Sequence, residues 1–182
     1  MIMIAQAGLR AEDLVFHLSD GHYMVNHVTD SMISVMWHLM SEPQKEEFEI
    51  LYGKGGGLDG MRREIRESDH AVAFFCGDKI TCLMWAAWQD HDGINEHART
   101  LGCVCSDYAL KHTINFVKHS KECRDAFMMT EPPNVTEIYV FITEHFKSSR
   151  EWAVRVCGLK EVCKATANGG HFVCYRHATG ED

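Results

Sequence analysis

The stretch from residue 136 to residue 162 constrains the fold more than any other part of this chain, because a buried strand passes directly into an amphipathic helix. Residues 136–143, TEIYVFIT, alternate β-branched and aromatic side chains, which is typical of a buried strand. Ser148 or Ser149 can cap the helix that follows, and the apolar residues of SREWAVRVCGL share one helical face. Gly158 predicts the end of this helix, because glycine readily adopts a left-handed conformation.

Length and composition predict an ordinary globular chain. With 182 residues, 46% of them hydrophobic, and only three prolines, we expect one domain over residues 1–182 with one core. The net charge of −8 comes from acidic residues spread along the chain, which argues against a nucleic-acid partner. No segment has the length of a membrane span, and MIMIAQAGLR lacks the basic start of a signal peptide. These features predict a cytoplasmic protein without a membrane partner.

The chain contains eight cysteines, which could indicate disulfides. A chain this large and apolar does not need such crosslinks, so we expect reduced thiols. Cys103 and Cys105 alternate along a predicted strand and so face the same side, while Cys76 and Cys82 flank a predicted hairpin turn. A nucleophilic thiol would need a nearby base and a lowered pKa, and the sequence shows neither. Packing as small hydrophobic side chains is therefore the favoured interpretation.

Further strands and helices are predicted on both sides of these features. Apolar runs at residues 71–75 and 80–88 are separated by CGDK, which predicts an antiparallel hairpin with Gly77 and Asp78 in its turn. The other predicted strands lie at 1–7, 100–105 and 171–176, and the other predicted helices at 10–18, 25–40, 44–52, 58–68 and 108–119.

The strand at 136–143, the helix after it and the Gly158-Leu159 pair resemble the last third of the GNAT acyltransferase superfamily, whose helix commonly ends in Gly-Phe. The resemblance implies an α/β (α+β) fold with a mixed, mostly antiparallel central sheet flanked by helices. The helical section before the hairpin would be enlarged. Such a sheet splays open to admit acyl-coenzyme A. Three patterns, GLDGMRREIRES, Arg99-Thr100 and SREWAVRVCGL, also resemble GNAT-like proteins of tailed bacteriophages, including the internal virion protein group.

In this superfamily the strand that corresponds to 100–105 is followed by a turn with the pattern Gln/Arg-x-x-Gly-x-Gly/Ala. Its backbone N–H groups bind the coenzyme A pyrophosphate at a helix N-terminus. The turn here has no glycine, so Tyr108 and Leu110 would crowd the pyrophosphate if they filled the cleft. Lys111 and His112 could contact phosphate or simply form a solvated helix face. The resemblance assigns coenzyme binding to Cys105, Ser106, Asp107, Tyr108, Ala109, Lys111 and His112.

The helix after the penultimate strand carries the remaining residues that the resemblance implies. Lys147 occupies the position where the superfamily often has an Asn that assists coenzyme binding, and Val154 occupies that of a Tyr that often protonates the leaving thiolate. Glu144 and His145 end the strand, where either could be the base for the amine or an exposed loop residue. Two functions follow: an acetyl-coenzyme A-dependent N-acyltransferase with a degenerate turn and unknown acceptor, or a non-catalytic virion or interaction component.

Two other groups of residues invite alternative interpretations. The segment QDHDGINEH holds His91 and His97 among acidic residues, but it lacks both a H-E-x-x-H helix and paired C-x-x-C motifs. An acidic loop without metal is therefore predicted. A second group combines methionine and tryptophan at helical and strand spacing, which indicates core packing or, if exposed, an interface with a protein partner or a second copy. Its members are Met24, Met32, Met36, Trp37, Met40 and Trp88.

Overall fold

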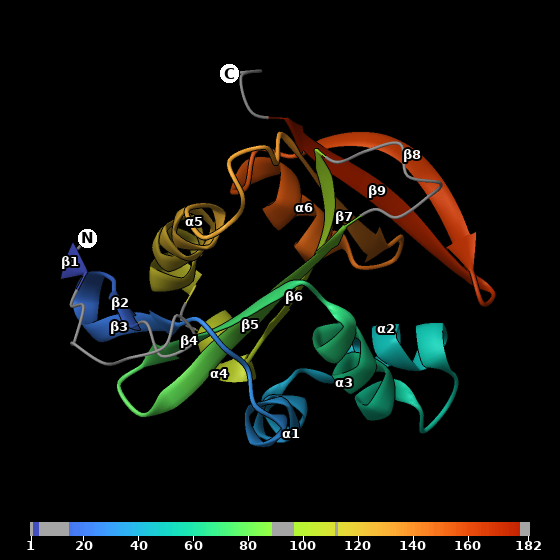
Figure 1. The fold of residues 1–182 in the computed structure, drawn as a ribbon. Coiled ribbons are helices and arrows are strands. Elements are labelled where there is room, and N and C mark those ends of the chain that lie inside the picture. Colours follow the sequence, from blue (N-terminus) through green and yellow to red (C-terminus); the bar gives the residue numbers. More distant parts are fainter. Residues whose placement is uncertain (1, 4–14, 89–96, 112, 179–182) are drawn as a thin grey trace.

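The computed structural model describes residues 2–3, 15–88, 97–111 and 113–178. Its strands form one sheet in the order β1-β2-β3-β4-β5-β6-β7-β9-β8 (Figure 1). All neighbouring strands are antiparallel except β6 and β7, so the predicted mixed, mostly antiparallel sheet is confirmed. The strands are β1 (Ile2–Met3), β2 (Val15–His17), β3 (His22–Val25), β4 (His70–Cys76), β5 (Lys79–Trp88), β6 (Ala98–Cys105), β7 (Glu137–Thr143), β8 (Lys160–Ala167) and β9 (Gly170–Ala178).

Helices cover both faces of the sheet. Figure 1 shows α1, α2 and α3 on one side and α5 and α6 on the other, with α4 following the end of β6. None of the described helices is long and apolar enough to cross a membrane. The helices are α1 (Asp30–Leu39), α2 (Glu42–Tyr52), α3 (Gly57–Glu67), α4 (Asp107–Lys111), α5 (Thr113–Met128) and α6 (Lys147–Arg155).

The sheet opens where β6 and β7 part. The two strands pair in parallel only at their beginnings, where Ala98–Thr100 lie beside Glu137–Tyr139. Beyond this point β6 stays with β5 and reaches Cys105 opposite Cys82, whereas β7 stays with β9. The opening that the resemblance implies therefore follows directly from strand register.

Alternation along β5 and β6 sends side chains to two separate cores. Leu83, Trp85 and Val104 pack with the helices α1, α2 and α3. Cys82 and Cys105 face the opposite side, where they pack with the end of α5. Because neighbouring residues of a strand point to opposite faces, this short stretch of sheet builds two chemically different environments.

A buried ion pair lies at the base of the opening. The Arg99 guanidinium lies 3.0 Å from the Glu131 carboxylate, and both side chains are almost fully buried. Glu131 also contacts His70 Nδ1 at 2.7 Å, and the other ring nitrogen of His70 lies 2.7 Å from the Asn26 amide oxygen. The guanidinium stacks over the Trp88 ring at 4.0 Å. This network ties the first residues of β6 to β4 and to the segment that precedes β7.

Glycine ends elements at two predicted places. Gly77 has φ of +59° in the turn between β4 and β5, and Gly158 has φ of +70° just after α6. Both values lie in the left-handed region that side chains with a Cβ rarely adopt. The hairpin and the end of the helix are thus confirmed.

The predicted cap of α6 is wrong. The helix begins at Lys147, with Phe146 as the N-cap residue and without a side-chain cap. The Phe146 N–H donates to the Thr143 carbonyl at 3.0 Å, so the chain turns immediately after β7. Ser148 and Ser149 consequently lie inside the first turn of the helix, too late to cap it.

Two predictions near the N-terminus also differ from the structure. The predicted helix at 10–18 contains β2 in its last part, while residues 4–14 lie outside the described residues. The predicted helix at 25–40 begins only at Asp30, where Thr29 caps it, and the residues just before it form β3. β3 pairs with β2 on one side and β4 on the other, so hydrogen bonding in the sheet overrides local helix periodicity.

Candidate functional site

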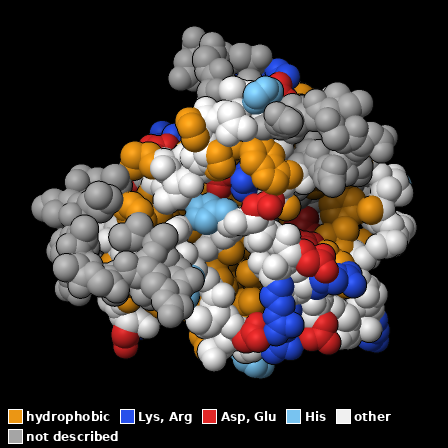
Figure 2. Space-filling view, viewed as in Figure 1, with side chains coloured by type: hydrophobic (Ala, Val, Ile, Leu, Met, Phe, Trp, Pro, Cys, Tyr) orange, Lys and Arg blue, Asp and Glu red, His pale blue; other side chains and the backbone are white. Residues whose placement is uncertain are grey.

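A cavity of about 150 Å³ lies on the α5 and α6 side of the opening. Leu101 and Cys103 line it from β6, Ile138 and Val140 from β7, and Trp152 from α6. Ile138 still lies beside Arg99 of β6, whereas Leu101, Cys103 and Val140 lie beyond the last paired residues, so the cavity extends along the parted strands. Figure 2 shows apolar side chains around the middle of this view and charged ones gathered over α2 and α3.

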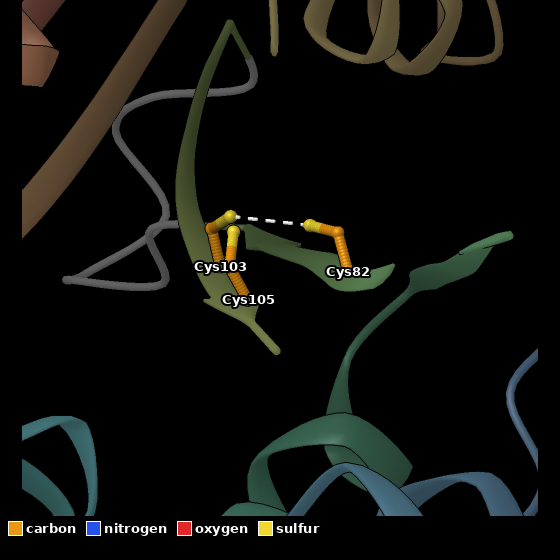
Figure 3. Close-up of side chains that lie close together, drawn as sticks. All are labelled: Cys82, Cys103 and Cys105. Atoms are coloured by element: carbon orange, nitrogen blue, oxygen red, sulfur yellow. Dashed lines mark hydrogen bonds between the residues drawn. The ribbon is translucent and has the colours of Figure 1, made fainter. Parts of the chain in front are cut away.

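Three thiols meet on the wall of this cavity. Cys82 on β5 lies directly opposite Cys105 on β6, and Cys103 is two residues earlier on the same strand. The Sγ atoms of Cys82 and Cys103 are 3.5 Å apart, and all three Sγ atoms lie within 4.8 Å of one another (Figure 3). The prediction that Cys103 and Cys105 face one side is confirmed, but their convergence with Cys82 depends on strand register.

Hydrogen bonding among the three thiols separates their pKa values. The contact with Cys103 raises the pKa of Cys82, and the contact with Cys105 raises that of Cys103, with burial adding to both. S–H donors from Cys103 and Cys82 instead lower the pKa of Cys105 to about 5. The pKa values separate because S–H groups beside one sulfur favour its thiolate, whereas neighbouring thiolates would repel one another.

The opposite face of the sheet, toward α3, carries a carboxylate instead of thiols. Glu64 on α3 accepts hydrogen bonds from the Tyr52 hydroxyl and, at 3.2 Å, from the Trp85 indole N–H. Burial raises the pKa of Glu64 above its usual value. The Trp85 ring covers Gly102, where an added Cβ would lie 2.1 Å from the ring. Glu64 is therefore connected through Trp85 to Gly102, two residues beyond the last β6 residue that pairs with β7.

A second partly buried carboxylate lies at the far end of β7. Glu47 on α2 accepts a hydrogen bond from the backbone N–H of Thr143 at 2.8 Å. Burial raises its pKa as well. Glu47 and Glu64 were not identified from the sequence, since each is one of many charged residues on a predicted helix. Only the packing of α2 and α3 against the sheet distinguishes them.

The structure divides the predicted pyrophosphate turn into a part inside the cavity and a part outside it. Cys105, Tyr108 and Ala109 line the cavity. The Ser106 hydroxyl is fully buried and accepts the Ala109 N–H at 3.3 Å, which caps α4. Because Ser106 is used in this way, it stabilises the local turn.

The charged residues of the turn lie at the surface. Lys111 forms an exposed ion pair of 2.6 Å with Asp107, and His112 lies outside the described residues. Tyr108 remains 40% exposed, with the Lys79 ammonium 4.5 Å from its ring centre. Tyr108 thus forms part of the cavity rim with a cation beside it.

The residues predicted around α6 are distributed along the surface. Glu144 forms an ion pair with Lys164, whose ammonium lowers the pKa of this carboxyl group, and His145 is exposed. The Lys147 side chain is 86% exposed, and its ammonium lies 3.9 Å from the Glu151 carboxylate. None of the predicted residues Glu144, His145 and Lys147 is part of the cavity wall.

Two further predicted groups remain, the acidic segment QDHDGINEH and the set of methionine and tryptophan residues. Residues 89–96 of the acidic segment lie outside the described residues, while the ring of His97 contacts the Asn134 carbonyl at 2.9 Å. The predicted core role of methionine is confirmed for Met24, Met36 and Met40, which are at most 3% exposed.

The comparisons with known proteins agree on the fold. No protein-family model matches the sequence, and no curated sequence is significantly similar to it. Among solved structures, the ribosomal-protein-S5-alanine acetyltransferase of Vibrio fischeri matches with a TM-score of 0.59 and 9% identity, over 93% of this chain and 98% of that chain. The ribosomal L7/L12 α-N-protein acetyltransferase RimL, in complex with coenzyme A, matches with a TM-score of 0.61 and 10% identity, over 92% and 99%.

A third structure broadens this group. The aminoglycoside acetyltransferase AAC(6')-Ib, in complex with ribostamycin and coenzyme A, matches with a TM-score of 0.60 and 11% identity, over 88% of this chain and 94% of that chain. Such low identities establish the architecture and leave the activity to be argued from the site. The chain therefore has the GNAT fold.

Proposed function

We propose that this protein is an acyl-coenzyme A-dependent N-acyltransferase. One observation carries the proposal: β6 and β7 part after Thr100 and Tyr139, with an apolar cavity on one face of the sheet and the partly buried carboxylate of Glu64 on the other. Acetyl-coenzyme A would supply the activated acyl group. Structural neighbours with the same fold were solved with coenzyme A, which supports a cofactor of this type.

The cavity fits the apolar end of such a cofactor. Leu101, Ile138 and Val140 can surround an acyl group and the arm that carries it. Because β6 and β7 no longer pair with each other beyond the opening, their facing edges can donate backbone N–H groups to carbonyl oxygens. Two cations contact the predicted pyrophosphate turn, since Lys79 lies over the Tyr108 ring and Lys111 pairs with Asp107.

The carboxylate side fits an incoming amine. Glu64 is held by the Tyr52 hydroxyl and the Trp85 N–H, so its orientation is fixed before substrate arrives. A base with a raised pKa accepts a proton more readily at neutral pH than an ordinary carboxylate does. We therefore assign to Glu64 the removal of the proton that the amine loses during transfer, with Glu144 and His145 as the sequence-based alternatives.

A second candidate is a non-catalytic GNAT-like protein that acts as an interaction or virion component. It is favoured by the absence of glycine from the turn and by the surface positions of Lys147 and Val154, where the superfamily often has Asn and Tyr. This candidate predicts folded protein that neither binds acetyl-coenzyme A nor transfers its acyl group.

Calorimetric titration of acetyl-coenzyme A into the reduced full chain separates the two candidates. The enzyme proposal predicts saturable binding of one molecule per chain. Val140→Trp should fill the cavity from β7 and weaken binding at least about tenfold, or 1.4 kcal/mol. Phe141→Ala is the matched control, because Phe141 is the next residue on the same strand and is 41% exposed outside the cavity.

The outcomes divide clearly. Loss of affinity in Val140→Trp alone supports the cavity as the coenzyme site. No heat and no thermal shift at millimolar acetyl-coenzyme A would overturn the enzyme proposal and support the non-catalytic candidate. Equal binding by Val140→Trp and wild type would place any coenzyme elsewhere on the molecule. Reductant must be present, because coenzyme A can form disulfides with accessible thiols.

A further inference from the structure

We propose that Cys82, Cys103 and Cys105 bind one thiophilic metal ion, Zn(II) or Cu(I), through their three sulfur atoms. The inference is independent of the proposed acyltransferase activity. It rests on the convergence of three cysteine side chains from two adjacent strands on one point of the cavity wall (Figure 3).

The sulfur positions are close to those that a metal requires. A zinc–sulfur bond of about 2.3 Å places two sulfur ligands of a tetrahedral ion about 3.8 Å apart. The Sγ atoms of Cys82 and Cys103 are already 3.5 Å apart, and no pair in the group exceeds 4.8 Å. Side-chain rotations of less than about 1 Å at sulfur would therefore complete the site.

The backbone supports this geometry without rearrangement. Cys82 and Cys105 are register partners across the antiparallel pair β5 and β6, and Cys103 lies on the same face two residues away. Three ligands held on paired strands lose little conformational freedom when a metal binds. Such preorganisation distinguishes the group from thiols that meet only by chance on flexible loops.

The surroundings select the kind of metal. Sulfur ligands favour Zn(II) and Cu(I) over Mg(II) and Ca(II), which prefer oxygen. Cys82 and Cys105 are buried and Cys103 is partly buried, yet all three face a cavity through which an ion can enter. Six of the eight cysteines line this same cavity, namely Cys76, Cys82, Cys103, Cys105, Cys123 and Cys157.

The position of a fourth ligand separates the two metals. Cu(I) is satisfied by three sulfur atoms, whereas Zn(II) takes four ligands. The fourth position of a tetrahedral ion would face the cavity, which Cys123 of α5 also lines. Removal of the Cys123 thiol should therefore weaken Zn(II) binding and leave Cu(I) binding unchanged.

The test is an anaerobic titration of the reduced, metal-free full chain with no coenzyme present. Co(II) reports thiolate ligation by absorption in the near ultraviolet and by intense visible bands of a tetrahedral ion. Zn(II) and Cu(I) are then added against chromophoric competitors to measure stoichiometry and affinity. The variants are Cys82→Ser, Cys103→Ser and Cys105→Ser, with Cys163→Ser as the matched control, since Cys163 is an exposed thiol on β8.

The proposal predicts one ion per chain and an affinity lowered at least about 100-fold in each of the three variants, more than the loss of a supporting residue would cause. Cys163→Ser should bind as tightly as wild type. Circular dichroism and thermal melting of the metal-free variants identify those that fold. Cys103→Ser should disturb folding least, because Cys103 is partly exposed whereas Cys82 and Cys105 are buried.

Two results would overturn the proposal. One is the absence of sulfur-to-metal absorption at one equivalent of Co(II) together with no Zn(II) or Cu(I) binding by wild type. The other is undiminished binding by folded Cys103→Ser. Because acetyl-coenzyme A is absent from the titration, failure of the acyltransferase proposal would not alter either result.

Discussion

The two faces of the opened sheet differ in chemistry although the same strands build both. Toward α5 and α6, β5 and β6 present Cys82, Cys103 and Cys105 beside an apolar cavity. Toward α3, the same strands present Trp85 and Gly102, and Trp85 contacts the partly buried carboxylate of Glu64. The alternation of residues along a strand allows one short stretch of sheet to support two unrelated microenvironments. Substitutions can therefore perturb one face without the other.

The first test of this separation breaks the buried ion pair between Arg99 and Glu131, which anchors both faces. Glu131→Gln leaves the Arg99 guanidinium buried without its carboxylate, and removal of one partner of a buried pair typically costs about 3 kcal/mol or more. We expect both faces to lose stability together, as a lower midpoint in urea unfolding. Glu144→Gln, which breaks an exposed ion pair, should leave the midpoint unchanged. Equal midpoints for the two variants would contradict the role of Arg99 and Glu131 as a common anchor.

The second test acts on the carboxylate face alone. Glu64→Gln keeps both hydrogen bonds possible but removes the base, so the rate of acyl transfer should fall about 100-fold or more. Binding of acetyl-coenzyme A on the other face should not change. Turnover measured by mass spectrometry and affinity measured by calorimetry give the two readouts. A Glu64→Gln enzyme with full activity, beside an inactive Glu144→Gln, would favour the base expected from the sequence.

The third test fills the space between Gly102 of β6 and the Trp85 ring. Gly102→Ala places a Cβ 2.1 Å from the Trp85 ring, and such overpacking costs roughly 2 kcal/mol. Thermal unfolding should show the loss. Trp85→Phe removes the indole atoms nearest to that Cβ, so the double variant should recover part of the stability. Strictly additive effects of the two substitutions would show that the contact is not the cause.

The smallest expected effect concerns pH. Burial raises the pKa of Glu64 in the folded state above its usual value near 4.5, so the folded state binds more protons than the unfolded state between the two pKa values. Stability should therefore decrease as pH rises from about 4.5 through the raised pKa. Glu64→Gln should make this part of the stability profile flatter. An unchanged slope in urea midpoints across this pH range would assign the dependence to other groups, such as Glu47.

The sequence predicted the architecture well where local signals agreed with tertiary structure. The hairpin turn at Gly77, the strand before α6 and the stop at Gly158 were all visible in residue patterns. β3 was missed because its pairing with β2 and β4 cannot be seen from local periodicity. The cap of α6 was misplaced because the chain turns directly after Thr143, before the two serines are reached.

The site was less predictable than the fold, since it depends on contacts between distant segments. Cys103 and Cys105 could be placed on one face from their spacing, but their meeting with Cys82 required the register of β5 and β6. Glu64 gave no signal among the charges of its helix, and only its hydrogen bonds from Tyr52 and Trp85 mark it. The turn after β6, predicted from the resemblance as a coenzyme site, contributes Tyr108 and Ala109 to the cavity wall, and its coenzyme-binding role stays a prediction.

Hydrogen–deuterium exchange with and without acetyl-coenzyme A tests the central claim most directly, because it reports on both faces in one experiment. The claim is that coenzyme enters from the α5 and α6 side while Glu64 serves an amine on the other. It predicts added protection in residues 101–105 and 138–143 and in the start of α6, with α3 unchanged. Protection concentrated in α2 and α3, or none anywhere at saturating acetyl-coenzyme A, would contradict it.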